Sequence, residues 1–177
     1  MLNELKHIAK ITPAEPAIKA AFLNRLNNKA VSRDENKLTH FCIYFAAYDP
    51  DKQLVFIGRH IKSGLWLFNG GHLDKNESAV LALNREINEE WGSSVKIGTI
   101  NTPRLLTITL IDNPIQPCKT HFDIWYFLAF DSRSFNPDPN LLAKEFHEWG
   151  WYDFSQAQSL VKDKNTLAAI GVIEEQL

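Results

Sequence analysis

Hydrophobic residues follow strand-like runs through the middle of the chain and helical spacing towards both ends. Two aromatic and β-branched runs, over 39–49 and 53–60, flank the turn sequence PDK, which predicts a β-hairpin. The sequence GLWLFNGG follows and predicts a short strand that ends in glycines. Further strands are expected over 95–100, 105–111 and 121–130, and within EFHEWGWYDF after the loop sequence NPDPN.

The first thirty residues read as helical, with a break at Pro13. Ile18, Phe22 and Leu26 stand at helical spacing and predict an apolar face. The polar stretch SRDENK then predicts a hinge, so we expect a helical extension over 1–36 and a main domain over 37–177.

A second helix is predicted over 77–91, where apolar residues recur three and four positions apart. Asp74 or Asn76 is expected to cap its N-terminus, and Gly92 to end it. The tail over 155–177 predicts one or two more helices. Strands followed by helices favour one α/β domain with helices on both sides of a curved sheet. The predicted stripe of the 77–91 helix consists of Val80, Leu83, Ile87 and Trp91.

Composition narrows the function without naming it. The net charge of −2 and the absence of a Lys- or Arg-rich run exclude broad electrostatic binding of a nucleic-acid polymer. Cys42 and Cys118 are too few for a disulfide framework and lack metal-type spacing, and Cys42 sits in an apolar run typical of a buried, inert thiol. No signal peptide or membrane span is evident, so we expect a cytoplasmic protein.

The 77–91 helix carries an unusual cluster of acids. Glu86, Glu89 and Glu90 fall within an arc of about 100° and project together. One interpretation is a solvated acidic face. The other is a cation site, because clustered carboxylates stay ionised cheaply only beside a cation, and Mg²⁺ prefers a few carboxylates together with substrate phosphates. Arg85 could brace one carboxylate, and the preceding pair Gly70-Gly71 allows close backbone approach to a ligand.

The spacing of the whole stretch favours the cation site. Gly71, five residues, Glu77, seven residues and then REINEEWG resemble the Nudix box of the Nudix hydrolases. All eight defining positions of that box are met. The resemblance implies a Nudix-type α/β/α sandwich with a curved mixed sheet. It also implies Mg²⁺ or Mn²⁺ as cofactor and attack by water on phosphorus, which cleaves the pyrophosphate bond of a nucleoside-diphosphate-linked substrate.

The same resemblance assigns roles by position. Glu77 and Arg85 would hold the loop and the helix in register. A late carboxylate is also expected to serve as ligand or base, with Glu148 favoured over Glu145. The general base is left open between Glu89 and Glu90. The implied metal ligands of the box are the Gly70 carbonyl, Glu86, Glu89 and Glu90.

Two positions depart from the family pattern. Ser93 stands where an aliphatic residue usually follows the last glycine, and Asn69 stands where a proline usually precedes the glycine pair. Neither departure removes an expected ligand.

Candidate substrate contacts lie outside the box. The aromatic rings of Trp66, Phe68 and Trp149 could stack on a base or pack in the core. His72, beside the glycines, could face the site or brace its loop. The remaining two candidates, His121 and Asp123, would share one face of a strand, where they could contact substrate or a further metal, or form a hydrogen-bonded pair at a sheet edge.

Three functions are consistent with this pattern. The favoured one is a Nudix pyrophosphohydrolase acting on a small nucleotide-type molecule, with no membrane or nucleic-acid polymer as partner. A Nudix-fold module that senses a nucleotide or sugar-nucleotide without turnover is the alternative, although the intact box acids count against it. An isomerase of the isopentenyl-diphosphate kind would need a characteristic cysteine setting that Cys42 and Cys118 lack. The substrate stays open, and the N-terminal helices could serve a homodimer.

Overall fold

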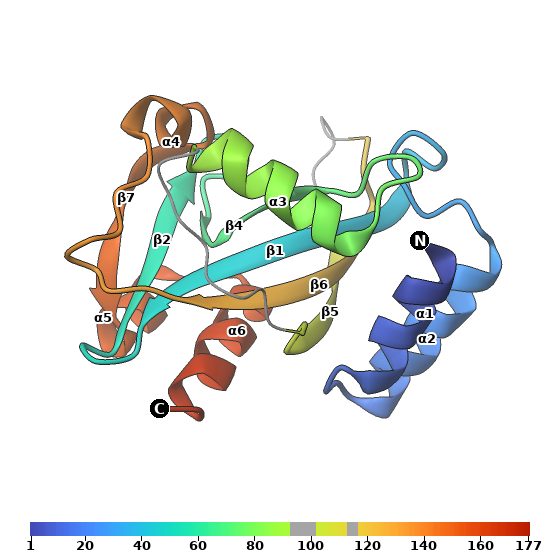
Figure 1. Cartoon of the computed structure of the whole chain (residues 1–177), viewed down its shortest axis with the longest axis horizontal. Coiled ribbons are helices and arrows are strands. Elements are labelled where there is room, and N and C mark those ends of the chain that lie inside the picture. The colour runs from blue at the N-terminus through green and yellow to red at the C-terminus, as the bar shows by residue number, and fades with distance from the viewer. Residues whose placement is uncertain (93–101, 113–116) are drawn as a thin grey trace. The chain divides into compact units, whose positions relative to one another are not determined.

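The computed structural model describes residues 1–92, 102–112 and 117–177 (Figure 1). The strand predicted at 95–100 lies outside the described residues. Among those residues, seven strands form one open sheet in the order β3-β2-β1-β6-β5, with β4 paired to β1 and β7 to β2. The bounds are α1 Leu2–Ile11, α2 Pro16–Asn27, β1 Thr39–Asp49, β2 Leu54–His60, β3 Trp66–Leu67, β4 Asn69–His72, α3 Ala79–Glu90, β5 Leu105–Leu110, β6 Thr120–Ala129, α4 Pro139–Glu145, β7 Phe146–Asp153, α5 Phe154–Leu160 and α6 Lys164–Glu174.

The predicted class, a mixed sheet with flanking helices and an N-terminal helical pair, is confirmed. Backbone contacts divide the chain into two compact units, and β1, α3 and β6 each contribute to both. No helix in the described part of the chain combines the length and the hydropathy of a membrane span. The first unit comprises 1–44, 70–84 and 102–126, and the second comprises 45–69, 85–101 and 127–177.

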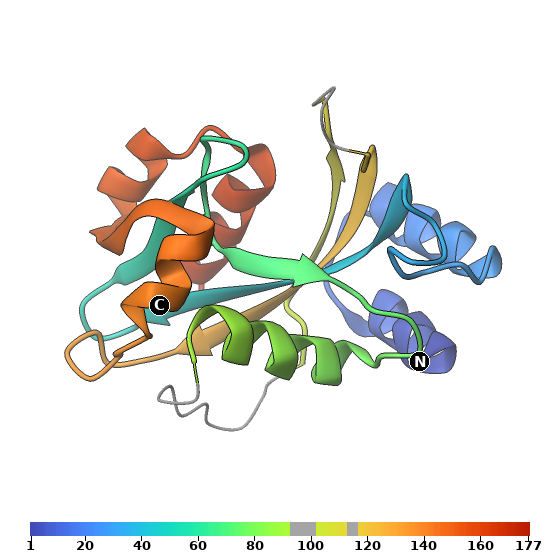
Figure 2. The ribbon, with the colours of Figure 1, turned by 90° about the horizontal axis from the view of Figure 1, so that it is seen from above.

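In the first unit, α1 and α2 lie side by side (Figure 1), and β5 runs antiparallel to the first part of β6 (Figure 2). Three phenylalanine rings join α2 to β1 and β6. Phe22 meets Phe41 and Phe122 edge-on, with ring centroids 5.6 and 5.1 Å away, and Phe41 stacks on Phe122 at 5.4 Å. Phe22 is fully buried, as its helical spacing predicted. These contacts fix the start of β1 against β6.

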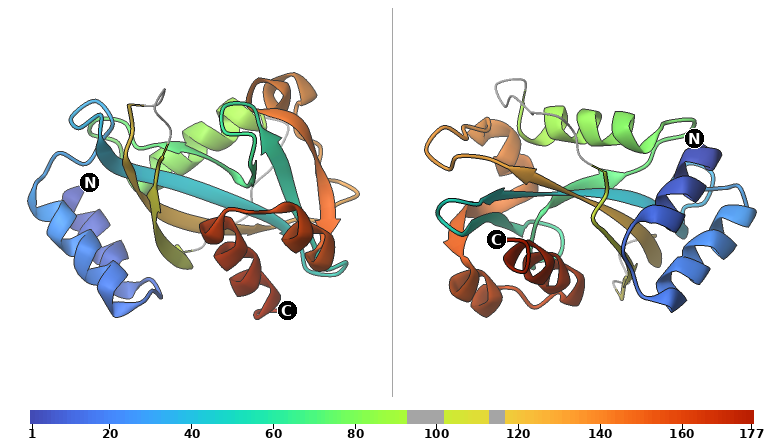
Figure 3. Two further views of the ribbon diagram at one scale, coloured as in Figure 1. Left: turned by 180° about the vertical axis from the view of Figure 1, so that it is seen from behind. Right: turned by 60° about the horizontal axis from the view of Figure 1, so that its bottom comes forward.

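In the second unit, β2 pairs with β7 along most of its length, and α5 packs against both strands (Figure 3). An aromatic cluster fills one side of this pair: Phe56 meets Trp151 at 5.4 Å and Phe135 at 5.0 Å, and Phe135 meets Trp91 at 5.0 Å. Trp91 follows α3, so this cluster fixes the C-terminal end of that helix.

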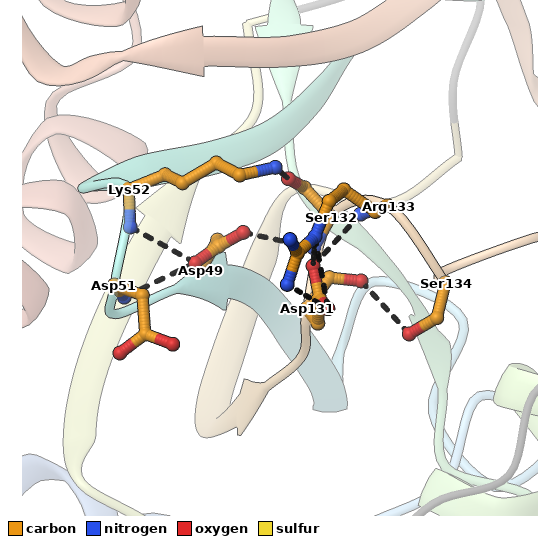
Figure 4. A network of polar contacts seen from close by, with 7 residues as sticks. All are labelled: Asp49, Asp51, Lys52, Asp131, Ser132, Arg133 and Ser134. Atoms are coloured by element: carbon orange, nitrogen blue, oxygen red, sulfur yellow. Dashed lines mark hydrogen bonds and ion pairs between the residues drawn. The ribbon is translucent and has the colours of Figure 1, made fainter.

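A buried carboxylate organises the β1–β2 turn. Asp49 is 1% exposed, and its two oxygens accept backbone N–H bonds from Asp51, Lys52 and Ser132 (Figure 4). The Lys52 ammonium also donates to the Ser132 hydroxyl at 2.8 Å. Burial alone would raise the pKa of Asp49, but the amide donors outweigh burial and lower it. Asp49 therefore joins the hairpin turn to the segment that follows β6.

Three local predictions are wrong in detail. Ser78, not Asp74 or Asn76, caps α3, because its hydroxyl accepts the Leu81 N–H at 3.2 Å. Val80 is 41% exposed, because the buried stripe of α3 begins one residue earlier, at Ala79. The strand predicted in GLWLFNGG is two short strands, β3 and β4.

Candidate active site

The C-terminal half of α3 carries the three clustered acids. Glu86 and Glu90 are each 7% exposed, whereas Glu89 points to solvent. The Arg85 guanidinium donates to Glu86 at 2.7 Å and reaches Glu89 at 3.4 Å through the same nitrogen. Arg85 therefore holds two neighbouring carboxylates, where the sequence suggested bracing of one. The burial of Glu86 and Glu90 distinguishes them from the acids on the solvated face of an ordinary amphipathic helix.

The third carboxylate has its own partner. The buried Asn69 side-chain amide donates a hydrogen bond to the Glu90 carboxylate. Asn69 is the residue that departs from the proline usual before the glycine pair. The departure therefore places a donor against a box acid, a role that a proline ring could not perform.

The loop before α3 is held by its own contacts. Glu77 accepts the Asp74 N–H at 3.1 Å, which closes the loop one turn ahead of the helix. A Cβ on Gly70 would lie 2.5 Å from the Ile43 carbonyl oxygen, so this glycine is required by close approach to β1. Gly92 has φ +81° and ends α3, as predicted.

Glu148 lies inside β7, within the sequence EFHEWGWYDF that predicted a strand. The ladder shifts register here, with Gly58 opposite Trp149 and His60 opposite Phe146. His147 and Glu148 therefore oppose the single residue Arg59, as in a β-bulge. Glu148 accepts from Arg59 Nε at 3.1 Å, and both side chains are largely exposed. The other late acid, Glu145, ends α4 and lies 3.8 Å from His60 Nε2.

The aromatic candidates do not share one surface. Trp66 pairs with Arg59, whereas Trp149 pairs with Gly58, so their side chains lie on opposite faces of the sheet. Trp66 meets Tyr152 edge-on at 5.3 Å, and both tryptophans are half-buried. Phe68 is 2% exposed, which favours core packing over substrate contact for this ring.

The first unit brings His72 and His121 into a second group of side chains. Three imidazole rings lie with centroids 4.7, 4.9 and 5.0 Å apart, and a cysteine Sγ lies 4.0 Å from His72 Nε2. One potential ligand atom from each member lies within 4.8 Å of those of the others. We call this group the His/Cys cluster; its members are His40, His72, Cys118 and His121.

Sequence reasoning named two members of this cluster and missed the other two. His40 is fully buried at the start of β1. It lies in a largely apolar run that gives no local sign of a metal ligand. Cys118 and His121 form a Cys-x-x-His spacing that could have been noticed. Burial lowers the pKa of His121 to about 3, and burial also lowers that of His40.

Asp123 is fully buried in β6, two residues from His121. It accepts hydroxyl hydrogen bonds from Thr107 at 3.1 Å and Thr109 at 2.6 Å, both on β5. Thr107 in turn accepts the Trp125 indole N–H at 2.8 Å. Cross-strand hydroxyls thus hold the Asp123 carboxylate in place.

The family model described as NUDIX domain matches residues 38–173. This chain belongs to the Nudix family. Nudix hydrolases generally use a divalent metal ion. The predicted Nudix-type fold and the resemblance of the Gly71–Gly92 stretch are thereby confirmed.

Similar proteins agree on the fold. The RNA pyrophosphohydrolase of Ruthia magnifica subsp. Calyptogena magnifica is 32% identical over 112 residues, which are 59% of this chain and 63% of that protein. The dihydroneopterin triphosphate pyrophosphohydrolase of E. coli superposes with a TM-score of 0.59 at 20% identity, covering 73% of this chain and 91% of that one. The Nudix domain of Shewanella oneidensis NrtR, complexed with ADP ribose, gives 0.59 at 15% identity, covering 77% and 86%.

Proposed function

We propose that this chain is a Mg²⁺-dependent Nudix pyrophosphohydrolase, with Mn²⁺ able to replace Mg²⁺. It cleaves the pyrophosphate bond of a nucleoside-diphosphate-linked small molecule by attack of water on phosphorus. One observation carries the proposal: all box positions are met, and three carboxylates on one short helical segment are held by Arg85 and Asn69. The donor set fits the hard cation, because carboxylate oxygens are the ligands that Mg²⁺ prefers.

The carboxylates have different surroundings and therefore different proposed roles. Glu86 and Glu90 are nearly buried and held by fixed donors, which suits metal ligands together with the Gly70 carbonyl. Glu89 is exposed, so it can act as a ligand and also accept a proton from water. Glu90 is the other candidate base. The bound ion would neutralise charge on the diphosphate and lower the pKa of the attacking water.

The remaining predicted residues have supporting roles in this proposal. Glu77 and Arg85 keep the loop and helix in the required geometry. Glu148 is proposed as a further metal ligand; its Oε1 is paired with Arg59, and its second carboxylate oxygen is the one that would bind the ion. The predicted substrate contacts are Trp66, Phe68, His72, His121, Asp123 and Trp149. Burial disfavours this role for Phe68, His121 and Asp123. Trp66 and Trp149 lie on opposite faces of the sheet, so one substrate would contact only one of these two rings.

The substrate class is the least constrained element. The similar proteins act on or bind quite different molecules according to their names: RNA, dihydroneopterin triphosphate and ADP ribose. ADP ribose, dihydroneopterin triphosphate and RNA with a 5′-triphosphate share a pyrophosphate linkage, the part that the box would handle. We propose a small nucleotide-type substrate, a cytoplasmic location and a helical extension over 1–36 preceding the domain over 37–177. The family match, which begins at residue 38, supports that boundary.

A substrate panel tests the proposal. The purified full chain is incubated with Mg²⁺ or Mn²⁺ and ADP-ribose, nucleoside triphosphates, nucleoside diphosphate sugars, dihydroneopterin triphosphate or RNA with a 5′-triphosphate. The proposal expects metal-dependent release of a phosphorylated product from at least one small molecule. Release from RNA alone would overturn the substrate class. Binding without turnover across the whole panel would overturn hydrolysis and support the sensing module.

A further inference from the structure

The His/Cys cluster lies in the first unit and uses none of the Glu86, Glu89 and Glu90 carboxylates. We propose that it binds one zinc ion in a closed tetrahedral site. Three imidazole nitrogens and one thiolate sulfur are a ligand set that favours zinc over Mg²⁺, which prefers oxygen. The inference does not depend on the box carboxylates, and it gives His72 and His121 a structural role in place of substrate contact.

The geometry is close to what tetrahedral zinc requires. Ligand atoms around zinc stand about 3.3–3.8 Å apart, since Zn–N and Zn–S bonds are about 2.0–2.3 Å long. The four candidate atoms all lie within 4.8 Å of one another, and His72 Nε2 is 4.0 Å from Cys118 Sγ. Small side-chain rotations would therefore complete the site without a change of backbone.

Hydrogen bonding fixes His40 in the ligand form. Its Nδ1 lies 2.9 Å from the Asn36 carbonyl oxygen, which can only accept, so Nδ1 carries the proton and Nε2 carries a lone pair. His40 Nε2 and His121 Nε2 are both buried and have no hydrogen-bond partner among the described residues. A buried nitrogen left in this state costs free energy that a metal ion would recover.

The cluster lies in a largely buried environment. Asp123, which has an oxygen within 4.8 Å of a His121 ring nitrogen, places a carboxylate beside the cluster. His40 is fully buried, Cys118 is 3% exposed and His121 is 9% exposed. Such burial is typical of a structural zinc site and leaves no open position for a substrate.

The positive charge around the cluster explains why one of its ligands must be an anionic thiolate. Arg25 and Arg33 place positive charge near His40, and Arg33 also acts on His121. A divalent cation would add to that charge, so the site needs the Cys118 thiolate. Binding releases the thiol proton to solvent, and the sulfur lone pair then forms the Zn–S bond.

A second group of potential metal ligands shares His121 with the His/Cys cluster and provides the control for the test. Cys42, His121 and Asp123 also offer three potential ligand atoms within 4.8 Å of one another. Both cysteines are buried and neither is in a disulfide. Cys118→Ser and Cys42→Ser are therefore matched variants that separate the two arrangements.

The test measures zinc in the full chain and replaces it with Co²⁺. Protein grown with zinc is passed through a desalting column, and bound metal is counted by mass spectrometry. We expect about one zinc per chain, retained in Glu90→Gln, which excludes the box as its source. The Co²⁺ form should show intense tetrahedral d–d bands and a thiolate-to-Co²⁺ charge-transfer band, lost in Cys118→Ser and kept in Cys42→Ser.

His72→Ala tests the cluster at its most exposed member, where folding is least at risk. Zinc affinity, measured by chelator competition, should fall at least about 100-fold, since loss of even an outer-shell partner costs about 10–100-fold. Absence of zinc from the wild-type chain after growth with zinc, together with no Co²⁺ charge-transfer band, would overturn the proposal. Loss of the band in Cys42→Ser but not in Cys118→Ser would also overturn it.

Discussion

The Asn69 side-chain amide donates a hydrogen bond to the Glu90 carboxylate, across twenty-one positions of sequence. Both residues are buried, at 2% and 7% exposure. The position where relatives of this type usually carry proline thus holds a box carboxylate in one orientation.

Asn69→Asp should lower the stability of the metal-free protein. It replaces the donor by a second carboxylate beside Glu90, and two buried like charges in contact disfavour the folded state. We expect the free energy of unfolding at neutral pH to fall by about 2–4 kcal/mol in chelator. Urea unfolding measures the effect.

The matched control is Asn88→Asp, which adds the same charge to an exposed position of α3. It should change the free energy of unfolding by less than about 0.5 kcal/mol. Equal effects of the two substitutions would show that the Asn69–Glu90 contact contributes nothing specific.

Thr107→Val should cost more stability than Thr109→Val. Both hydroxyls donate to Asp123, but Thr107 also accepts the Trp125 indole N–H. Valine keeps the shape and removes the hydroxyl, so Thr107→Val takes away two hydrogen bonds in a buried site. We expect losses of about 2–3 kcal/mol for Thr107→Val and about 1 kcal/mol for Thr109→Val, measured by urea unfolding. The reverse order would contradict the assigned network.

Asp49→Asn should destabilise the protein at neutral pH by about 1–3 kcal/mol, because one of the two acceptor oxygens becomes an NH2 donor that faces a backbone N–H, such as that of Ser132. The pKa of Asp49 is lowered in the folded state, so its stabilisation is present above the unfolded pKa of about 4 and is lost as pH falls further. The gap between wild type and variant should therefore narrow below about pH 4. Unfolding free energies measured across this range test it. A gap independent of pH would contradict the charged form of Asp49 as the acceptor.

Much of the fold follows from the sequence because its signals are local. The aromatic and β-branched runs over 39–49 and 53–60 predict β1 and β2, and Gly92 marks the end of α3. The cap at Ser78 was missed because several polar residues precede the helix. Only the folded backbone shows that the Ser78 side chain accepts the Leu81 N–H.

The sequence predicted which site residues lie together only where their spacing along one helix determines it. The box acids share one helix, so their juxtaposition follows from periodicity. Asn69 with Glu90, and His40 with Cys118, meet through strand pairing and tertiary packing, which no local pattern encodes. The pairing of Glu148 with Arg59 was not predicted, because the bulge that brings them together has no simple sequence signature.

The central claim is hydrolysis by the box carboxylates with a divalent cation. The most direct measurement is the rate of phosphate or pyrophosphate release from a panel substrate with Mg²⁺, for wild type, Glu89→Gln and Glu90→Gln, with the exposed Glu175→Gln as control. We expect the control to keep its rate, and at least one box variant to lose about 100-fold or more, with no wild-type turnover in chelator. Undiminished turnover in both box variants, or wild-type turnover without a divalent ion, would contradict the account.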